Sequence, residues 1–588
     1  MKLLADSTQV LLRDWFAIFG FCLVALWGGL IVSAFITRIT KIHLTSSELF
    51  SLGAAGWVVA TLFAATIIFL SRVAWPVGIL CAILLITGLV ALYFLRERLK
   101  TKNILWLLLL IFAVLFFLRL AFLAKTSLPL YFDSAEHYRI IEVLMREYES
   151  PQTGTLSWPA PTYYHIGFHV VTAILTFTLQ ADPKTMILLF GQFVLACIPV
   201  SVYLIASRES KSSLGGLFAV LLAGFGWFMP AHAVNWGKYP ALISLLTIQF
   251  SLGIAYLLNE QRAAYQKRML WIFLILSILV SFLVHTRSVI VIGIFIATWI
   301  LANLWTRSSK VARYIIFGIV LAVLIGFTYW LESGGLKSVF EPYFGAGILV
   351  TCIALLLSLF AARVSPRIAL CSMLSILLIL SCLFIPIKLP VLGNLTLLDR
   401  PFVEMILFIP LAIIGGVGFA GLLLFLQKFP ALPRVARIAI MVFISVALIA
   451  NSWMKYSYYP SSCCQLVQPD DIIALDWLNK NLPANAKIAI SSSELNVQFN
   501  ETSEAYTGID AGVWIAPLTD RVTMLLPFTF DFSQASNHAQ LCQMKLDYIY
   551  VGGKAQSFDR TKLNSQPDWY HPIFTLPQVQ IDEIRGCT

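Results

Sequence analysis

Long apolar runs follow one another through the first 453 residues, and this pattern leaves few folds open to the chain. A transmembrane helix needs roughly 17–25 predominantly apolar residues. Runs of spanning or near-spanning length lie at about 15–36, 50–70, 74–95, 104–124, 184–207, 214–230, 240–257, 270–284, 288–305, 314–331, 343–362, 368–386, 403–427 and 438–453. We therefore expect a polytopic α-helical membrane protein with about fourteen transmembrane helices.

Composition supports lipid as the solvent for most of the chain. Of the 588 residues 59% are hydrophobic and 12% charged, whereas a soluble domain has roughly 25% charged residues. Residues 454–588 carry 9 basic and 14 acidic side chains, and the rest carries 32 basic and 16 acidic ones. The net charge of +11 therefore belongs to the loops of the membrane part and does not indicate nucleic-acid binding.

Basic loops set the expected orientation, because cytoplasmic loops are enriched in Lys and Arg. Six such loops share one side if the apolar stretch 166–180 does not cross the membrane, and its 15 residues with His169 suit an interfacial or re-entrant helix. The loop 125–183, the N-terminus and the C-terminal tail then lie outside the cytoplasm. The six loops are 96–102, 208–211, 262–268, 307–313, 363–367 and 428–437.

The tail, residues 454–588, has the pattern of a small α/β unit. Asp470 and Asp471 precede the periodic run IIALDWLNKNL, which predicts a helix with an acidic first turn. KIAIS, LDYIYVGG and PQVQIDEI predict strands. The tail holds four cysteines, Cys463, Cys464, Cys542 and Cys587. They suit one or two disulfides in an oxidising compartment or four free thiols, and the sequence does not decide between these.

An acidic motif in the first large outer loop is the strongest sign of chemistry. Asp133, Glu136 and His137 follow an apolar span where a helix begins, and their spacing lets all three share one face. Together they could bind a divalent metal, and an acid among them could act as a general base. The alternative is a capping arrangement, with Asp133 at the N-cap and Glu136 at the third helical position.

A second group in the same loop is Tyr164, His165 and His169. The two histidines are four residues apart, a spacing that can ligate metal on a helix. Without a third ligand, interfacial aromatic and histidine side chains are the simpler interpretation, above all for His169.

Three basic residues lie at outer helix ends, although Lys and Arg are otherwise concentrated in the loops expected to be cytoplasmic. Lys238, Arg287 and Arg400 lie where charge near hydrocarbon is costly, so each needs a compensating group. A phosphate is one such group, since Arg offers it a bidentate fork. The alternatives are snorkelling of Lys238 to the interface and an ion pair of Arg400 with Asp399 or Glu404. Glu404 lies one turn into a span, and pairing with a nearby Arg explains it.

These motifs, in this order, resemble the GT-C superfamily of membrane glycosyltransferases, which use lipid-phosphate-linked sugars. The likeness is strongest to the bacterial protein-mannosyltransferase-like and aminoarabinose-transferase-like branch, and it covers roughly residues 104–588. It implies additional helices at 1–103, a GT-C-like catalytic module at 104–453 and an extracytoplasmic domain at 454–588. The matching residues are Tyr131-Phe-Asp133-Ser-Ala-Glu136-His137-Tyr138, Ala160-Pro161-Thr-Tyr163-Tyr164-His165, Asp399-Arg400-Pro-Phe402 and Asp470-Asp471-Ile-Ile-Ala-Leu-Asp476-Trp477.

The resemblance also implies site roles and partners. Asp133 and Glu136 would be the catalytic acids, with a possible Mg²⁺ or Mn²⁺ held by them and His137. A polyprenyl-phosphate sugar in the inner cell membrane would donate to a glycan, lipid or protein acceptor with inversion, and no nucleic acid is expected. The cations Arg400, Lys238 and Arg287 would bind the donor phosphate, and His137, Tyr164, His165 and His285 would line the substrate cavity.

Two other functions fit the same helices. A transporter or flippase of a lipid-linked or polysaccharide precursor would use charged residues at helix ends, although transporters place their sites near the bilayer midplane. A scaffold whose tail binds a partner is the third possibility. The sequence contains no Walker A, H-E-x-x-H or G-x-S-x-G motif, which weighs against ATP-driven transport and two common hydrolase classes.

Overall fold

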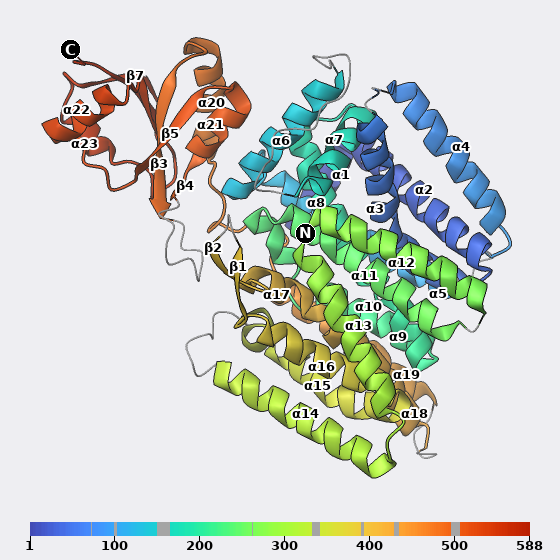
Figure 1. Cartoon of the computed structure of the whole chain (residues 1–588). Helices are drawn as coiled ribbons and strands as arrows, with labels where there is room; N and C mark the ends of the chain where they lie inside the picture. Colours follow the sequence, from blue (N-terminus) through green and yellow to red (C-terminus); the bar gives the residue numbers. More distant parts are fainter. Residues whose placement is uncertain are drawn as a thin grey trace.

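The structure is a computed structural model that describes residues 1–587 except 72, 74, 99–102, 150–164, 262, 332–340, 390–392, 429–433 and 495–505. Helices form a large body, and a smaller unit with a β-sheet stands beside one end of it (Figure 1). The expectation of a polytopic helical membrane protein with a C-terminal α/β domain is confirmed.

Ten helical segments among the described residues are long and apolar enough to cross a membrane. The four further expected runs also form helices, so each of the fourteen runs coincides with a helix. The ten are α2 (Trp15–Thr40), α3 (Ser46–Ser71), α4 (Val77–Leu95), α5 (Asn103–Leu120) with η1 (Ala121–Ala124), α8 (Pro183–Ser201) with α9 (Tyr203–Ser210), α11 (Tyr239–Glu260), α12 (Ala264–Val284), α13 (Arg287–Trp305), α14 (Lys310–Leu331) and α17 (Arg400–Ile406) with α18 (Phe408–Leu426). These four are α10 (Ser213–Phe225), α15 (Ile348–Val364), α16 (Pro366–Ser381) and α19 (Arg434–Lys455).

Apolar surface covers the outside of the helical body. In α4 and α14 only 11% of the spanning window is buried inside the protein, and side chains such as Leu89 and Ile319 are exposed. So much exposed apolar surface is unfavourable in water and suits lipid, while each helix satisfies its own backbone. Between helices small residues bring backbones close, since a Cβ at Gly29 of α2 would lie 3.0 Å from the carbonyl oxygen of Gly53 in α3.

The short helix α7 (Gly167–Leu179) lies in the position that the orientation argument requires. Its first residue packs on the backbone of Leu283, at the end of α12, and its last residue packs on Gly20, in the second turn of α2. Because the chain alternates direction through α2–α5 and through α8–α12, the start of α2 and the end of α12 lie on the same side only if α7 does not cross, and α7 contacts both. The structure therefore supports an α7 that does not cross the membrane.

The N-terminal helix α1 (Lys2–Arg13) lies on the same side as the C-terminal sheet unit. The Asp6 carboxylate accepts a hydrogen bond from the Tyr459 hydroxyl at 2.8 Å and pairs with Lys125, at the end of η1. Basic residues gather at the opposite ends of the helices, where Arg208 pairs with Glu48 at 2.7 Å. The two termini thus share one side, as expected.

The C-terminal unit contains a mixed six-stranded sheet. Its order is β4-β3-β6-β8-β7, with β5 paired to β3, and β3, β5 and β6 run parallel. The predicted helix and three strands are α20, β3, β6 and β8, whereas β4, β5 and β7 were not predicted. The elements are α20 (Pro469–Asn481), β3 (Lys487–Glu494), β4 (Tyr506–Gly508), η6 (Ala511–Trp514), α21 (Ile515–Thr519), β5 (Val522–Pro527), α22 (Ala535–Gln543), β6 (Tyr548–Val551), α23 (Arg560–Asn564), β7 (Tyr570–Thr575) and β8 (Gln580–Ile584).

The sheet unit docks on α6 (Phe132–Glu149), the helix that carries the acidic motif. The ring centroids of Tyr138 and Trp514 lie 5.7 Å apart, and Arg146 pairs with Asp520 at 3.0 Å. Two disulfides are present in the tail, Cys463–Cys464 and Cys542–Cys587. The alternative of two disulfides is therefore the one that the structure contains.

Candidate active site

A cavity of about 400 Å³ lies where α6, α11, α13 and α17 meet, on the side of the sheet unit. It collects residues that the sequence places in five separate segments. Most predicted site residues with described side chains line it, although 154 positions separate the first of them, Asp133, from the last, Arg287. The lining residues are Asp133, His137, His165, Lys238, Pro240, Ala241, His285, Thr286, Arg287, Ile290, Ile387, Thr396, Leu397, Asp399, Pro401, Phe402 and Met405.

Asp133 and Lys238 form an ion pair at one wall of this cavity. Asp133 lies in the first turn of α6 and is 4% exposed, and one of its carboxylate oxygens is 2.6 Å from the Lys238 ammonium nitrogen. Burial disfavours the charged ammonium, but the Asp133 carboxylate outweighs this and raises the pKa of Lys238. The pair therefore places a fixed cation beside the acid that was predicted to be catalytic.

Gly237 explains how Lys238 reaches α6. It ends the short helix η2 (Ala231–Trp236) with a φ of +62°, in the left-handed region that favours glycine. A Cβ there would lie 2.6 Å from the Ser134 hydroxyl oxygen, so only glycine permits this close approach to α6. The backbone then turns into α11, which begins at the residue after Lys238.

Glu136 does not share the cavity face with Asp133, which corrects the prediction of one common face. Its side chain is 37% exposed, and both carboxylate oxygens accept hydrogen bonds from the Arg139 guanidinium, at 2.6 and 2.8 Å. Asp133 and His137 are four residues apart and both line the cavity, whereas Glu136 is rotated away from them. The packing of α6 therefore directs one acid of the motif inward and the other outward.

His137 lies buried against His169, for which the sequence favoured an interfacial position over a role in the site. Its Nδ1 is 3.0 Å from Nε2 of His169, and Nδ1 of His169 contacts the backbone carbonyl oxygen of His165, also at 3.0 Å. His169 is fully buried, so its interpretation as an interfacial side chain was wrong. The four-residue spacing from His165 was the available signal, because it places His169 one helical turn deeper.

The predicted ligands Asp133, Glu136 and His137 do not fit a divalent metal in this arrangement. Lys238, Arg139 and His169 engage their donor atoms from three different directions. Within the described part of the chain, the one group of three His, Cys, Asp or Glu side chains with ligand atoms within 4.8 Å of one another is His538, Cys542 and Cys587. Two of these form a disulfide, which removes their thiolates as ligands.

Two further histidines line the cavity near the turn between α12 and α13. Nε2 of His165 accepts a hydrogen bond from the Thr286 backbone N–H at 3.3 Å and also contacts the Thr286 hydroxyl. The His285 ring stacks on Phe402, with centroids 4.6 Å apart and planes at 17°. Burial, with the Arg287 charge second, lowers the pKa of His165. A ring that stays neutral presents hydrogen-bonding groups to a substrate without adding charge. Tyr164 lies outside the described residues.

Arg287 and Arg400 differ in their relation to the cavity. Arg287 lines it, and its guanidinium pairs with the carboxylate of Asp399. Arg400 is not among the lining residues, and its Nε donates to Glu404 at 2.9 Å. The ion pair of Arg400 with Glu404, one of the two predicted alternatives, is therefore present. Asp399 was considered as a partner of Arg400 and holds Arg287 instead.

The lining of the cavity combines charged and apolar side chains. Asp133, Lys238, Asp399 and Arg287 form two ion pairs, and the Asp399 charge also acts on Lys238. Apolar lining side chains come from α13, from the segment that includes the hairpin β1 (Pro386–Leu389) and β2 (Gly393–Thr396), and from α17. They include Ile290, Ile387, Leu397, Pro401, Phe402 and Met405. Such a cavity accepts a ligand with a charged group joined to a hydrocarbon chain.

Comparison with known proteins gives matches among solved structures. No protein-family model matches the sequence, and no curated protein sequence matches it. The Archaeoglobus fulgidus oligosaccharyltransferase in its apo form aligns with a TM-score of 0.43 and 12% identity, over 77% of this chain and 70% of the other. The archaeal oligosaccharyltransferase AglB from Archaeoglobus fulgidus, in complex with an inhibitory peptide and a dolichol-phosphate, aligns with a TM-score of 0.41 and 12% identity, over 82% and 74%. The function proposed below rests on the cavity residues themselves.

Proposed function

We propose that this protein is a glycosyltransferase that moves a sugar from a polyprenyl-phosphate donor to an acceptor hydroxyl. The observation that carries the proposal is one cavity lined both by the Asp133–Lys238 and Asp399–Arg287 pairs and by apolar side chains. A lipid-linked sugar phosphate combines a hydrocarbon chain with an anionic phosphate and a polar sugar, so it offers both apolar and charged groups to such a cavity. The resemblance of the motifs to the GT-C superfamily supports the same function.

The proposed reaction uses Asp133 as the base. The acceptor hydroxyl approaches the carboxylate, loses its proton to it, and its oxygen attacks the anomeric carbon of the donor sugar. The bond from that carbon to the phosphate oxygen breaks, and the electron pair stays on the phosphate. A single displacement of this kind inverts the anomeric centre. The ammonium of Lys238 orients the carboxylate, which it contacts at 2.6 Å.

The leaving phosphate needs cations that do not have to reorganise during the reaction. Arg287 is the guanidinium on the cavity wall, and an entering phosphate would compete with Asp399 for it. Lys238 is the second cation. Arg400 is the third that we propose, and its Nε is held by Glu404. His137, His165 and His285 would hydrogen bond the sugar, and Phe402 would offer it an aromatic face.

The proposed setting is the cell membrane, with the cavity and the sheet unit on the extracytoplasmic side. Basic loops at the opposite helix ends support this orientation. We propose residues 104–453 as the catalytic module, 1–103 as an addition to it, and 454–588 as the extracytoplasmic domain. The acceptor is a glycan, a lipid or a protein. A divalent metal has no part in the proposed reaction, since the residues that would hold it point in different directions.

The test is transfer from a panel of radiolabelled polyprenyl-phosphate sugars by the purified protein in detergent, compared with Asp133→Asn and Arg287→Ala. Transfer by the wild type that is lost in Asp133→Asn would support the enzyme and the base. If every donor stays intact while all three proteins fold and bind the lipid equally, the proposal fails. Exchange of lipid-linked precursor across liposomes under those conditions would favour the transporter alternative.

A further inference from the structure

Two consecutive cysteines, Cys463 and Cys464, are joined by a disulfide in the link between the helical body and the sheet unit. The link runs from the end of α19 at Lys455 to the start of α20 at Pro469. The Cys463 side chain is exposed to solvent, whereas Cys464 is 4% exposed. A reagent can therefore reach one sulfur of the pair without unfolding the protein.

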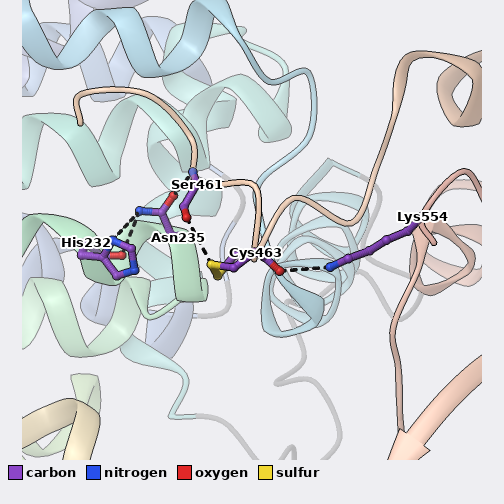
Figure 2. The surroundings of a disulfide bond; sticks show 6 residues. His232, Asn235, Ser461, Cys463 and Lys554 are labelled. Carbon is purple, nitrogen blue, oxygen red and sulfur yellow. Dashed lines mark hydrogen bonds between the residues drawn. A yellow bond between two sulfur atoms is a disulfide. The ribbon is translucent and has the colours of Figure 1, made fainter. Parts of the chain in front are cut away.

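The turn that carries this disulfide contacts three separate parts of the molecule. The backbone N–H of Ser461 donates to Oδ1 of Asn235 at 2.7 Å, and the ammonium of Lys554 donates to the carbonyl oxygen of Cys463 at 3.0 Å (Figure 2). The carbonyl oxygen of Cys464 accepts the backbone N–H of Tyr131 at 3.1 Å. Asn235 and Tyr131 belong to the helical body, and Lys554 belongs to the sheet unit.

Both contacts in the helical body lie directly beside the charged pair of the cavity. Tyr131 precedes Asp133 by two residues, and Asn235 precedes Lys238 by three. Tyr131 has a φ of +69°, a left-handed conformation that is unfavourable for a residue with a Cβ. The hydrogen bond to Cys464 helps to hold that conformation at the point where α6 begins. The turn thus supports the two segments that bring Asp133 and Lys238 together.

The disulfide closes a small ring that contains the peptide bond between Cys463 and Cys464. The carbonyl carbon of Cys463 is a member of this ring, so its direction is fixed, whereas the carbonyl group of Cys464 is attached to a ring atom, the Cα of Cys464, whose position the ring restrains. One carbonyl is directed at Lys554 in the sheet unit and the other at Tyr131 next to α6. Opening the ring restores rotation to this peptide, so the carbonyl group of Cys463 loses its fixed direction and the Cα that carries the carbonyl group of Cys464 is free to shift away from Tyr131.

We propose that Cys463–Cys464 is a thiol-exchange site whose oxidation state controls the geometry of the Asp133–Lys238 pair. The reagent is a dithiol, either a small molecule or a protein with two neighbouring thiols. A thiolate attacks Sγ of Cys463, and Cys464 leaves as a thiolate that takes up a proton. The second thiol of the reagent then displaces the mixed disulfide, which leaves two protein thiols and an oxidised reagent. The consequence for transfer rests on the function proposed above.

The other disulfide supplies an internal control. Cys542 belongs to α22 and is bonded to Cys587. Figure 1 shows α22 and the C-terminus at the end of the sheet unit that is far from the helical body. A dithiol reduces both bonds, but only Cys463–Cys464 belongs to the turn that contacts Tyr131 and Asn235. The variants C463S/C464S and C542S/C587S therefore separate the two effects.

The experiment compares the full-length wild type and both double variants, each oxidised and after dithiothreitol, with thiol content measured by mass spectrometry. The first readout is hydrogen exchange of residues 126–138 and 231–240, which is independent of transfer activity. We expect reduction to speed this exchange about tenfold in the wild type and in C542S/C587S. C463S/C464S should exchange fast without reductant and show no further change. Reduction of the wild type needs no substitution, so the test does not depend on the folding of a variant.

The second readout is sugar transfer, which we expect to fall about a hundredfold in the same pattern, since a small misplacement of catalytic groups has this effect. Unchanged exchange and transfer with Cys463 and Cys464 fully reduced would overturn the proposal, as would a change that follows Cys542–Cys587. If the exchange pattern holds but no protein transfers sugar, the coupling stands and the proposed function fails.

Discussion

The ammonium nitrogen of Lys238 lies 2.6 Å from a carboxylate oxygen of Asp133, although 105 residues separate the two in the chain. The contact requires α6 to begin where α11 begins, and Gly237 permits that approach. It also gives the acid a fixed orientation toward the cavity. The same contact brings a cation to the place where the sugar phosphate would leave. One ion pair thus joins the base and the phosphate site of the proposed reaction.

Asp133→Asn should lower sugar transfer by about 10²–10⁴-fold, the usual contribution of a positioned base. The amide keeps the size of the side chain and can still accept a hydrogen bond from Lys238, so binding of the donor should change little. The measurement is kcat and donor KM in detergent. Glu136→Gln is the matched control on the same helix, because that carboxylate points to Arg139 at the surface. A loss in Glu136→Gln as large as in Asp133→Asn would contradict the assignment of Asp133 alone.

Lys238→Met should destabilise the protein, because the buried Asp133 carboxylate then lacks the ammonium group. We expect a cost of about 1–3 kcal/mol, less than for a fully buried pair since solvent partly screens Lys238. The double variant D133N/K238M should regain part of this stability and remain inactive. Thermal unfolding of the wild type, D133N, K238M and the double variant gives a double-mutant cycle for this pair. Equal melting temperatures for K238M and the double variant would argue against a stabilising pair.

Arg287→Ala should raise the donor KM about 10–100-fold, the loss of a hydrogen bond between charged groups. Arg287→Lys keeps the charge without the planar fork, so its donor KM should lie between that of the wild type and that of Arg287→Ala. Arg400→Ala should have a smaller effect, because its Nε is bound to Glu404 and it does not line the cavity. Steady-state kinetics over a range of donor concentration distinguish these cases. If Arg400→Ala raises the donor KM more than Arg287→Ala does, Arg400 contributes more to phosphate binding than Arg287, contrary to the proposal.

The sequence predicts the helices and the general place of the site for one physical reason. A polar residue at the outer end of a span must lie at the membrane surface, so Asp133, Lys238, Arg287 and Asp399 were already confined to one layer. The pairing within that layer depends on tertiary packing. Nothing in the sequence distinguishes Asp399–Arg287 from the neighbouring Asp399–Arg400, and the structure contains the former.

The rotation of α6 about its own axis was the other property that the sequence could not predict. Residues three and four apart both lie near one face of a helix, so Glu136 and His137 looked equally able to join Asp133. Only the contacts of α6 decide that His137 is buried and Glu136 exposed. The strand β5 was missed for a related reason. VTMLLP has neither clear alternation nor a turn signal, and parallel pairing with β3 determines it.

Chelation tests the metal alternative. We expect transfer in the presence of EDTA to stay within about twofold of the untreated activity, because Lys238 occupies the position beside Asp133 that a metal ion would need. The protein is dialysed against EDTA before assay, and Mg²⁺ or Mn²⁺ is then added back. An activity that is lost and then restored by either ion would support a metal site in the substrate-bound enzyme.

Asp582, in β8 between β6 and β7 of the C-terminal sheet, should make the stability of that unit depend on pH. The residue is 1% exposed, and burial raises its pKa from 3.8 to about 6, against the Gln580 amide that donates to both its oxygens at 2.8 and 3.0 Å. A carboxyl with a raised folded-state pKa contributes its full stability below the unfolded pKa. That contribution is lost between about pH 4 and pH 6 and is absent above it.

Asp582→Asn removes this dependence, since the amide is neutral at every pH. At pH 7.5 the variant should be more stable than the wild type by up to about 3 kcal/mol, and near pH 4 the two should be equal. Hydrogen exchange of β6 and β8, compared between the proteins at one pH so that the chemical rate cancels, measures the difference. Asp476→Asn, on the exposed face of α20, is the control and should match the wild type at both pH values. Faster exchange in Asp582→Asn at pH 7.5 would mean that the carboxylate stabilises the sheet, with the Arg560 charge outweighing the cost of burial.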